Sequence, residues 1–189
     1  MTHILRVFCF IALTFGLMAG ETDQFDAARN NRTEALKSYL AAKGDPNRRD
    51  SSGHPLLILA AYNGSPDAVN VLLKYGADAN IQDNMGTSLM AASFKGQTAI
   101  VKSLLAAGAR VDERNGIGAT ALMFASMTAR FEIVRLLLNH RADVDAQDER
   151  GLTAGQLAEQ QGSGEMVNVL KNAGRAPRPG PTASSQSVP

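Results

Sequence analysis

Few residues of this chain have the types and spacing that catalysis or metal binding requires. The 189-residue sequence holds three histidines and a single cysteine. His3 and Cys9 lie in the first twenty residues, whereas His54 and His140 stand far apart, and neither has a second ligand at helical spacing. Metal ligation and nucleophilic catalysis both need several such groups brought together. We therefore expect no catalytic residue, no metal site and no cofactor, in a protein that is not an enzyme.

Three aspartates recur at a regular spacing and are the other candidates for chemistry. Asp50, Asp83 and Asp148 each open a Gly-containing segment that suits a turn. An Asp side chain in that place can accept hydrogen bonds from the backbone ahead of it and so stabilise the turn. Acid–base catalysis needs carboxylates that converge on one point, which a repeated spacing does not supply. We interpret these aspartates as turn residues.

The spacing of the aspartates belongs to a repeat of 32 or 33 residues that runs through most of the chain. The sequence Gly-Ala-Asp-Ala-Asn begins at Gly76, and similar segments begin at Gly108 and Arg141. Two columns keep this period, a polar one of Asn47, Asn80, Asp112 and Asp145, and an apolar one of Leu36, Val69, Val101, Val134 and Val167. A fixed period of this length is typical of a repeat architecture.

Each unit contains two helical patterns. Val69, Leu72 and Leu73 recur at helical spacing in one of them, and Leu73 belongs with Leu105 and Leu138 to a column expected to be buried. An Ala-rich helix precedes it and ends where Gly64, Gly96 or Gly162 allows a turn. The sequence thus predicts an all-α solenoid over 21–174, with repeats at about 21–49, 50–82, 83–114, 115–147 and 148–174.

On these residues the chain resembles the ankyrin-repeat family, whose unit is a β-turn followed by two helices. The resemblance covers 24–174 and is clearest at 59–64, 69–78 and 118–122. Pro55 stands where the family has Thr, and no repeat keeps the family's His, whose place is taken by Ile58, Met90, Met123 and Gln156. The resemblance implies helix-turn-helix units with protruding β-turn hairpins, which bind other proteins.

The first and fifth units differ from the middle three. The first begins at its first helix, without a hairpin, and the fifth carries Lys171 in place of Leu73 and Gly155 in place of Leu57. Terminal units of a solenoid need polar outer faces, because no neighbour covers them. We expect both units to be caps.

The two ends of the chain have other compositions. Residues 1–20 hold one charge, Arg6, and an apolar run of twelve residues that ends at Met18, before Ala19 and Gly20. This pattern predicts a secretory signal peptide, too short to span a bilayer, with an uncleaved anchor as the alternative. Residues 175–189 are rich in Pro and Ser and are expected to form a disordered tail. We expect an exported, periplasmic bacterial protein without stable membrane insertion after cleavage.

The charge of the predicted mature chain excludes one class of partner. Losing Arg6 from the 19 basic residues leaves as many basic as acidic residues, 18. Nucleic-acid binding depends on a basic surface, so no nucleic acid is expected as partner. Cys9 is lost with the signal peptide, so the mature chain needs no disulfide chemistry.

The resemblance also implies where binding takes place, because the two residues that follow the Ala-rich stretch face the concave groove of an ankyrin domain. Here the middle repeats place Tyr62, Phe94 and Met127, with Lys95 beside Phe94, while Met85 and Ile117 stand at hairpin tips. Aromatic and Met side chains are enriched in interface cores, although single exposed apolar residues are also normal. We predict a protein-binding surface at these six residues.

The leading interpretation is a non-catalytic, exported monomer that binds another protein through its concave face and hairpin tips. The chain resembles exported bacterial ankyrin-repeat proteins, some of which accompany catalases, which implies a catalase as partner and a role in oxidative stress. Two alternatives stay open. One is an inhibitor or immunity-type protein that restrains a cell-wall enzyme, and the other is a carrier of a small ligand or haem.

Overall fold

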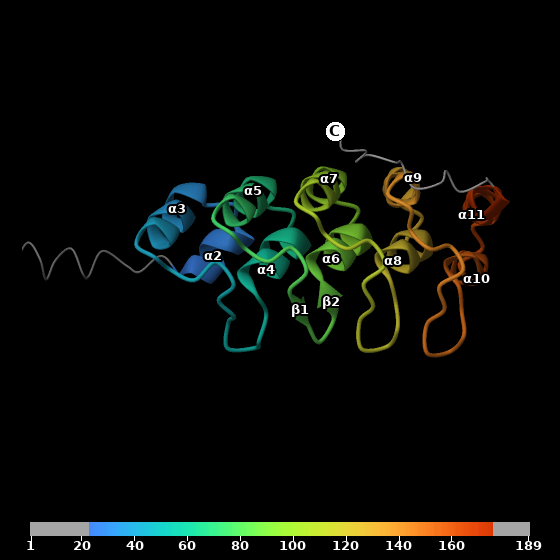
Figure 1. Cartoon of the computed structure of the whole chain (residues 1–189), viewed down its shortest axis with the longest axis horizontal. Helices are drawn as coiled ribbons and strands as arrows, with labels where there is room; N and C mark the ends of the chain where they lie inside the picture. Colours follow the sequence, from blue (N-terminus) through green and yellow to red (C-terminus); the bar gives the residue numbers. More distant parts are fainter. Residues whose placement is uncertain (1–22, 176–189) are drawn as a thin grey trace, which may run out of the picture.

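The computed structural model describes residues 23–175, and over this range it confirms the predicted all-α solenoid. Figure 1 shows helix pairs side by side along one axis, with an inner row, an outer row and hairpins that project from the inner side. The inner row is α2 (Gln24–Arg29), α4 (Leu56–Asn63), α6 (Ser88–Lys95), α8 (Ala121–Met127) and α10 (Ala154–Gln160). The outer row is α3 (Thr33–Ala41), α5 (Pro66–Lys74), α7 (Thr98–Ala106), α9 (Phe131–Asn139) and α11 (Gly164–Arg175).

The predicted signal peptide, with Cys9, lies outside the described residues. The same is true of the predicted tail beyond Arg175, which is itself the last residue of α11. Within residues 23–175 no helix is both long and apolar enough to cross a bilayer.

The inner helices are short, and their ends are set by local sequence. Thr87 Oγ1 accepts a hydrogen bond from the backbone N–H of Met90, which caps α6, and the same cap recurs at Thr120 and Thr153. Helices α4 and α6 end where Gly64 and Gly96 take left-handed φ angles of 71° and 78°. Small side chains let neighbouring inner helices approach closely, since these alanines are fully buried: Ala27, Ala28, Ala60, Ala61, Ala92, Ala125 and Ala158.

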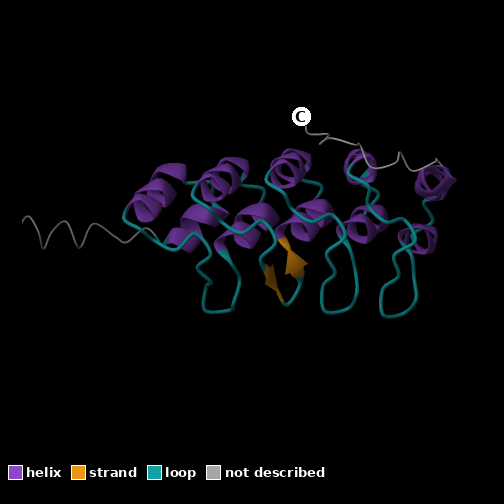
Figure 2. Ribbon diagram, in the orientation of Figure 1, coloured by secondary structure: helices purple, strands orange, loops and turns teal. Residues whose placement is uncertain are grey.

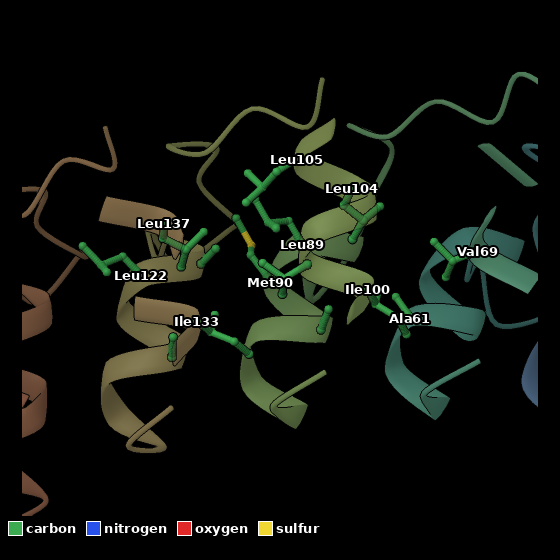
Figure 3. Packing of buried hydrophobic residues seen from close by; sticks show 14 of the residues in the cluster. Ala61, Val69, Leu89, Met90, Ile100, Leu104, Leu105, Leu122, Ile133 and Leu137 are labelled. Atoms are coloured by element: carbon green, nitrogen blue, oxygen red, sulfur yellow. The ribbon is translucent and has the colours of Figure 1, made fainter. Parts of the chain in front are cut away.

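The outer helices supply most of the large side chains of the core. Val69, Val101 and Val134 are fully buried, as the repeated apolar column predicted, and so are Leu72, Leu104 and Leu137. Figure 3 shows Val69, Leu104 and Leu137 among the core side chains. The prediction of a second buried column was partly wrong.

In that second column Leu105 is buried, but Leu73 and Leu138 are only half-buried. Each follows a fully buried leucine by one residue, so it lies about 100° further round the helix, at the edge of the apolar stripe. In the last repeat Lys171 is exposed, as expected of a cap.

The hairpins are mostly irregular loops, and Figure 2 shows strands in the hairpin of the third repeat only, among the described residues. There β1 (Gln82–Asp83) pairs with β2 (Gly86–Thr87) in antiparallel register, Gln82 opposite Thr87. The preceding hairpin is closed by a single bridge between Arg49 and Pro55.

The turn aspartates hold the hairpins as the sequence predicted. Asp50 Oδ1 accepts hydrogen bonds from the backbone N–H groups of Ser52 and His54, both at 3.0 Å. Asp83 and Asp148 make equivalent bonds in their hairpins. The remaining hairpin uses Asn115, whose Oδ1 accepts from Ile117 and Ala119.

The polar column links the first four repeats in succession. Asn47 Oδ1 accepts from the backbone N–H of Asp78 at 2.8 Å, Asn80 Oδ1 from Arg110 at 2.7 Å, and Asp112 Oδ1 from Asp143 at 2.8 Å. An oxygen-bearing side chain recurs at this position because it makes the same exposed hydrogen bond to the next repeat each time.

Candidate functional site

An apolar pocket of about 170 Å³ lies where inner helices α4, α6 and α8 meet the hairpins of the second and third repeats. Its polar wall consists of His54, Asp83, Gly86 and Thr87. The rest of the lining is apolar or aromatic: Ile58, Leu59, Tyr62, Met85, Met90, Ala91, Phe94 and Phe124. The lining comes mostly from the second and third repeats, with Phe124 from the fourth, so no single repeat forms the pocket alone.

The hollow has a simple origin in the repeat pattern. Leu59, Ala91 and Phe124 occupy the same position of three successive repeats, and all three line the pocket. Ala91 is small where its two neighbours are large, so the third repeat leaves space that its neighbours would fill.

Two aromatic side chains reach the surface beside this space. Tyr62 and Phe94 each stand two residues before the glycine that ends their helix, and they are 40% and 38% exposed. The Phe94 ring packs edge-on against Phe124, with ring centres 6.1 Å apart and planes at 84°. Contacts of this geometry are favourable, so Phe94 is held in place while part of its ring remains open.

A cation from the third repeat rests on an aromatic ring of the second. Lys95 Nζ lies 4.7 Å from the centre of the Tyr62 ring, within the range of a cation–π interaction. This contact favours a position of the lysine beside the pocket.

A histidine–carboxylate pair forms the polar wall. His54 Nδ1 lies 2.6 Å from Asp83 Oδ2, and the Asp83 side chain is only 4% exposed. The other carboxylate oxygen, Asp83 Oδ1, accepts hydrogen bonds from the backbone of Met85 and Gly86. Both carboxylate oxygens are thus engaged, and Nε2 is the ring nitrogen of His54 that is left for another partner.

A second carboxylate, that of Asp50 in the hairpin of the second repeat, is also paired. Burial by itself would raise the pKa of the Asp50 carboxyl, but hydrogen bonds from the backbone of His54 and Ser52 and the charge of Arg29 hold that pKa below its usual value. Arg29 Nη2 lies 2.7 Å from Asp50 Oδ2. Asp50 is therefore a structural anion.

The structure brings together only part of the predicted binding surface. Tyr62, Met85 and Phe94 line the pocket, and Lys95 stands at its edge. Met127 is half-buried and lies outside the lining, although it shares the repeat position of Tyr62 and Phe94. Ile117 is exposed on the next hairpin and also lies outside it.

Sequence reasoning missed several lining residues, namely His54, Ile58, Leu59, Met90 and Phe124. One signal was available, because the small residue Ala91 between Leu59 and Phe124 marks a position where packing changes. Another was the apolar residue at the place of the family's His, where Ile58 and Met90 now line the pocket.

The described part of the chain contains no candidate metal site. Over residues 23–175 no three His, Cys, Asp or Glu side chains come close enough to hold a metal ion.

Comparison with known proteins identifies the class. A family model described as ankyrin repeats (3 copies) matches residues 24–115 and 89–178, so the chain belongs to the ankyrin-repeat family. Ankyrin repeats are a protein-binding module, and the family is typically non-enzymatic.

Individual relatives share the repeats over part of their length. The chain is 33% identical over 102 residues to dauer abnormal formation protein 25 of Caenorhabditis elegans, which covers 53% of this chain and 26% of that protein. It is 39% identical over 80 residues to glycerophosphocholine phosphodiesterase gde1 of Schizosaccharomyces pombe, which covers 41% and 7%. It is 33% identical over 104 residues to BRCA1-associated RING domain protein 1 of C. elegans, which covers 54% and 15%. The chain spans about a quarter or less of each of these relatives.

Proposed function

We propose that this chain is an exported, non-catalytic protein that binds a partner through the surface of its inner helices and hairpins, with the pocket between the second and third repeats as the anchor point. One observation carries the proposal. Tyr62 and Phe94, which the solenoid does not need for its core, stand partly exposed at the rim of an apolar pocket. Interfaces concentrate their binding energy at aromatic anchors of this kind.

The size of the pocket favours a protein partner over a small ligand. Sites for small molecules and cofactors enclose roughly 300–1,000 Å³. The pocket encloses about 170 Å³, which suits one large side chain. This argues against the alternative of a haem or small-ligand carrier.

Two tyrosines provide a matched test of the binding face. Tyr62 is 40% exposed on the inner side, and Tyr75 is 42% exposed at the end of outer helix α5. We would replace each in turn by a photo-crosslinking phenylalanine analogue and irradiate cells that produce the protein. A covalent adduct from position 62 and none from position 75 is expected. Adducts from position 75 alone would show that the partner binds the outer helices instead.

The partner recovered in such an adduct decides between two classes of function. The resemblance to exported bacterial ankyrin-repeat proteins supports a catalase, with a role in peroxide resistance, and a cell-wall enzyme is the alternative. Activity of the identified enzyme, measured with and without the purified chain, then separates support from inhibition. Phe94→Ala should weaken binding by about thirty-fold or more, as expected for an aromatic anchor worth 2 kcal/mol.

Export rests on the sequence of residues 1–20, which has the charge, apolar run and small residues of a cleaved signal peptide. Intact mass of the protein from a periplasmic fraction tests it. We expect cleavage after Ala19 or Gly20, whereas retention of Met1 would mean that the segment is not removed.

A further inference from the structure

The charges around the pocket are unevenly paired. The carboxylate of Asp83 is bonded to His54, and that of Asp50 is paired with Arg29. Lys95, in contrast, has no carboxylate within ion-pair distance among residues 23–175. The charge that this rim offers to a partner is therefore positive.

A second cation stands at the same end of helix α6. The Arg130 guanidinium lies against Gly96, about 3 Å from where a Cβ would stand, and likewise has no carboxylate partner in the described structure. Cations near a helix C-terminus stabilise that helix, which accounts for Arg130 in this place. The helix C-terminus alone does not explain the position of Lys95, because its ammonium lies over the ring of Tyr62, in the neighbouring repeat.

The position of Lys95 over the Tyr62 ring favours the binding of an anion by its ammonium. A free lysine side chain loses rotamer entropy when it is fixed. Here the Tyr62 ring already restrains it, and the ring covers one side of an ammonium that has three N–H donors. Because Tyr62 also lines the pocket, an anion at Lys95 stands next to whatever side chain fills the pocket.

We infer that the pocket receives a partner segment in which an acidic residue stands next to a large apolar one: the apolar side chain enters between Tyr62 and Phe94, and the carboxylate is bound by Lys95. This inference rests on the proposed function and narrows its partner to acidic–apolar protein segments.

Three blocked peptides separate the apolar and the acidic contribution. The probes are acetyl-Gly-Phe-Glu-Gly-amide, the same peptide with Gln in place of Glu, and the same peptide with Ala in place of Phe. Binding to the purified protein is followed by NMR through the methyl groups of Met85 and Met90, which both line the pocket. The Phe-Glu peptide should shift these signals, the Phe-Gln peptide should bind about two- to five-fold more weakly, as expected for one exposed ion pair, and the Ala-Glu peptide should shift neither signal.

Two lysine variants assign the charge effect. Lys95→Gln should abolish the preference for Glu over Gln, whereas Lys74→Gln, at an exposed position of outer helix α5, should leave it intact. Added salt should reduce the preference, since exposed charges are screened. The inference is overturned if the Glu and Gln peptides bind equally or if the preference survives in Lys95→Gln. Absence of any shift at millimolar peptide would overturn the pocket as a side-chain site, while a crosslink from position 62 would still support the proposed function.

Discussion

His54 Nδ1 lies 2.6 Å from Asp83 Oδ2, so the hairpin of the second repeat is bonded to a buried carboxylate in the hairpin of the third. This bond crosses the boundary between repeats and also forms the polar wall of the pocket. The same pair of side chains therefore contributes to stability and to the proposed binding site.

We expect His54→Ala to destabilise the protein by about 1–3 kcal/mol, because it leaves Asp83 Oδ2 without its partner in a buried place. Urea unfolding measures the loss. His140→Ala is the control, since His140 is exposed and should cost under about 0.5 kcal/mol. A double-mutant cycle with Asp83→Asn should give a coupling above about 0.5 kcal/mol, and additive effects would contradict a direct interaction.

Ala129 offers a route to higher stability. Ala129 follows α8 and has a φ of 54°. At the equivalent position after α4 and α6, Gly64 and Gly96 take the same left-handed conformation. Left-handed backbone costs an L-residue other than glycine roughly 1–2 kcal/mol, more than the entropy that glycine adds to the unfolded chain. Ala129→Gly should therefore raise the melting temperature.

The control for this change is Ala106→Gly, also at an exposed position but at the last residue of α7, where φ is not positive. Glycine there should lower stability, by less than the roughly 0.5–1 kcal/mol of a helix interior. If both substitutions destabilise the protein equally, strain at Ala129 is not significant.

Val101→Asp should destabilise the whole domain by several kcal/mol, because Val101 is fully buried in the central repeat and a carboxylate there lacks a partner. Denaturant midpoints give the comparison with Lys102→Ala. Lys102 is exposed and its ion pair with Glu132, at 3.1 Å, is exposed as well, so that change should cost under about 1 kcal/mol. Coinciding midpoints would show that the outer helix is not packed as described.

Acid should weaken the last hairpin through Asp148. Hydrogen bonds from the backbone of Leu152 and from the Arg150 side chain hold the pKa of the Asp148 carboxyl below its usual 3.8. Because the folded value is the lower one, the charged group stabilises the fold above pH 3.8, and this contribution is lost as the pH falls through the folded pKa.

Asp148→Asn isolates that effect, because Asn115 already holds a hairpin of this chain with the same backbone bonds. Unfolding curves of the parent and the variant should differ at pH 6, and this difference should shrink as the pH falls from 3.8 through the lower folded pKa. A difference that stays constant with pH would mean that the Asp148 charge does not contribute to stability.

The fold could be predicted from the sequence because each repeat restates the same pattern. The column that contains Val69 and Val101 identifies the buried side of every outer helix, and Gly64 and Gly96 mark the ends of two inner helices. The half-exposure of Leu73 could not be predicted, since the edge of an apolar stripe is buried only if the neighbouring repeat curves over it.

The site could be predicted only in part, for a related reason. Position within a helix places Tyr62 and Phe94 on the correct face, but a pocket depends on which side chains of adjacent repeats leave space between them. Ala91 creates that space only because Leu59 and Phe124 lie on either side of it in the stack, a relation of three repeats that no single motif contains. Met127 shares the helix position of Phe94, yet the pocket extends only as far as Phe124.

The links from Asn47 to Asp78, from Asn80 to Arg110 and from Asp112 to Asp143 all run in one direction, with the acceptor in the earlier repeat and the amide in the later one. Asp145 stands at the next place in this series, beside the last helix pair of the described chain. Each of the first three units therefore carries its own connector to the unit after it. A whole repeat duplicated among these units would bring its own connector with it, so the solenoid can lengthen there in single-repeat steps, whereas an insertion of any other length interrupts the series.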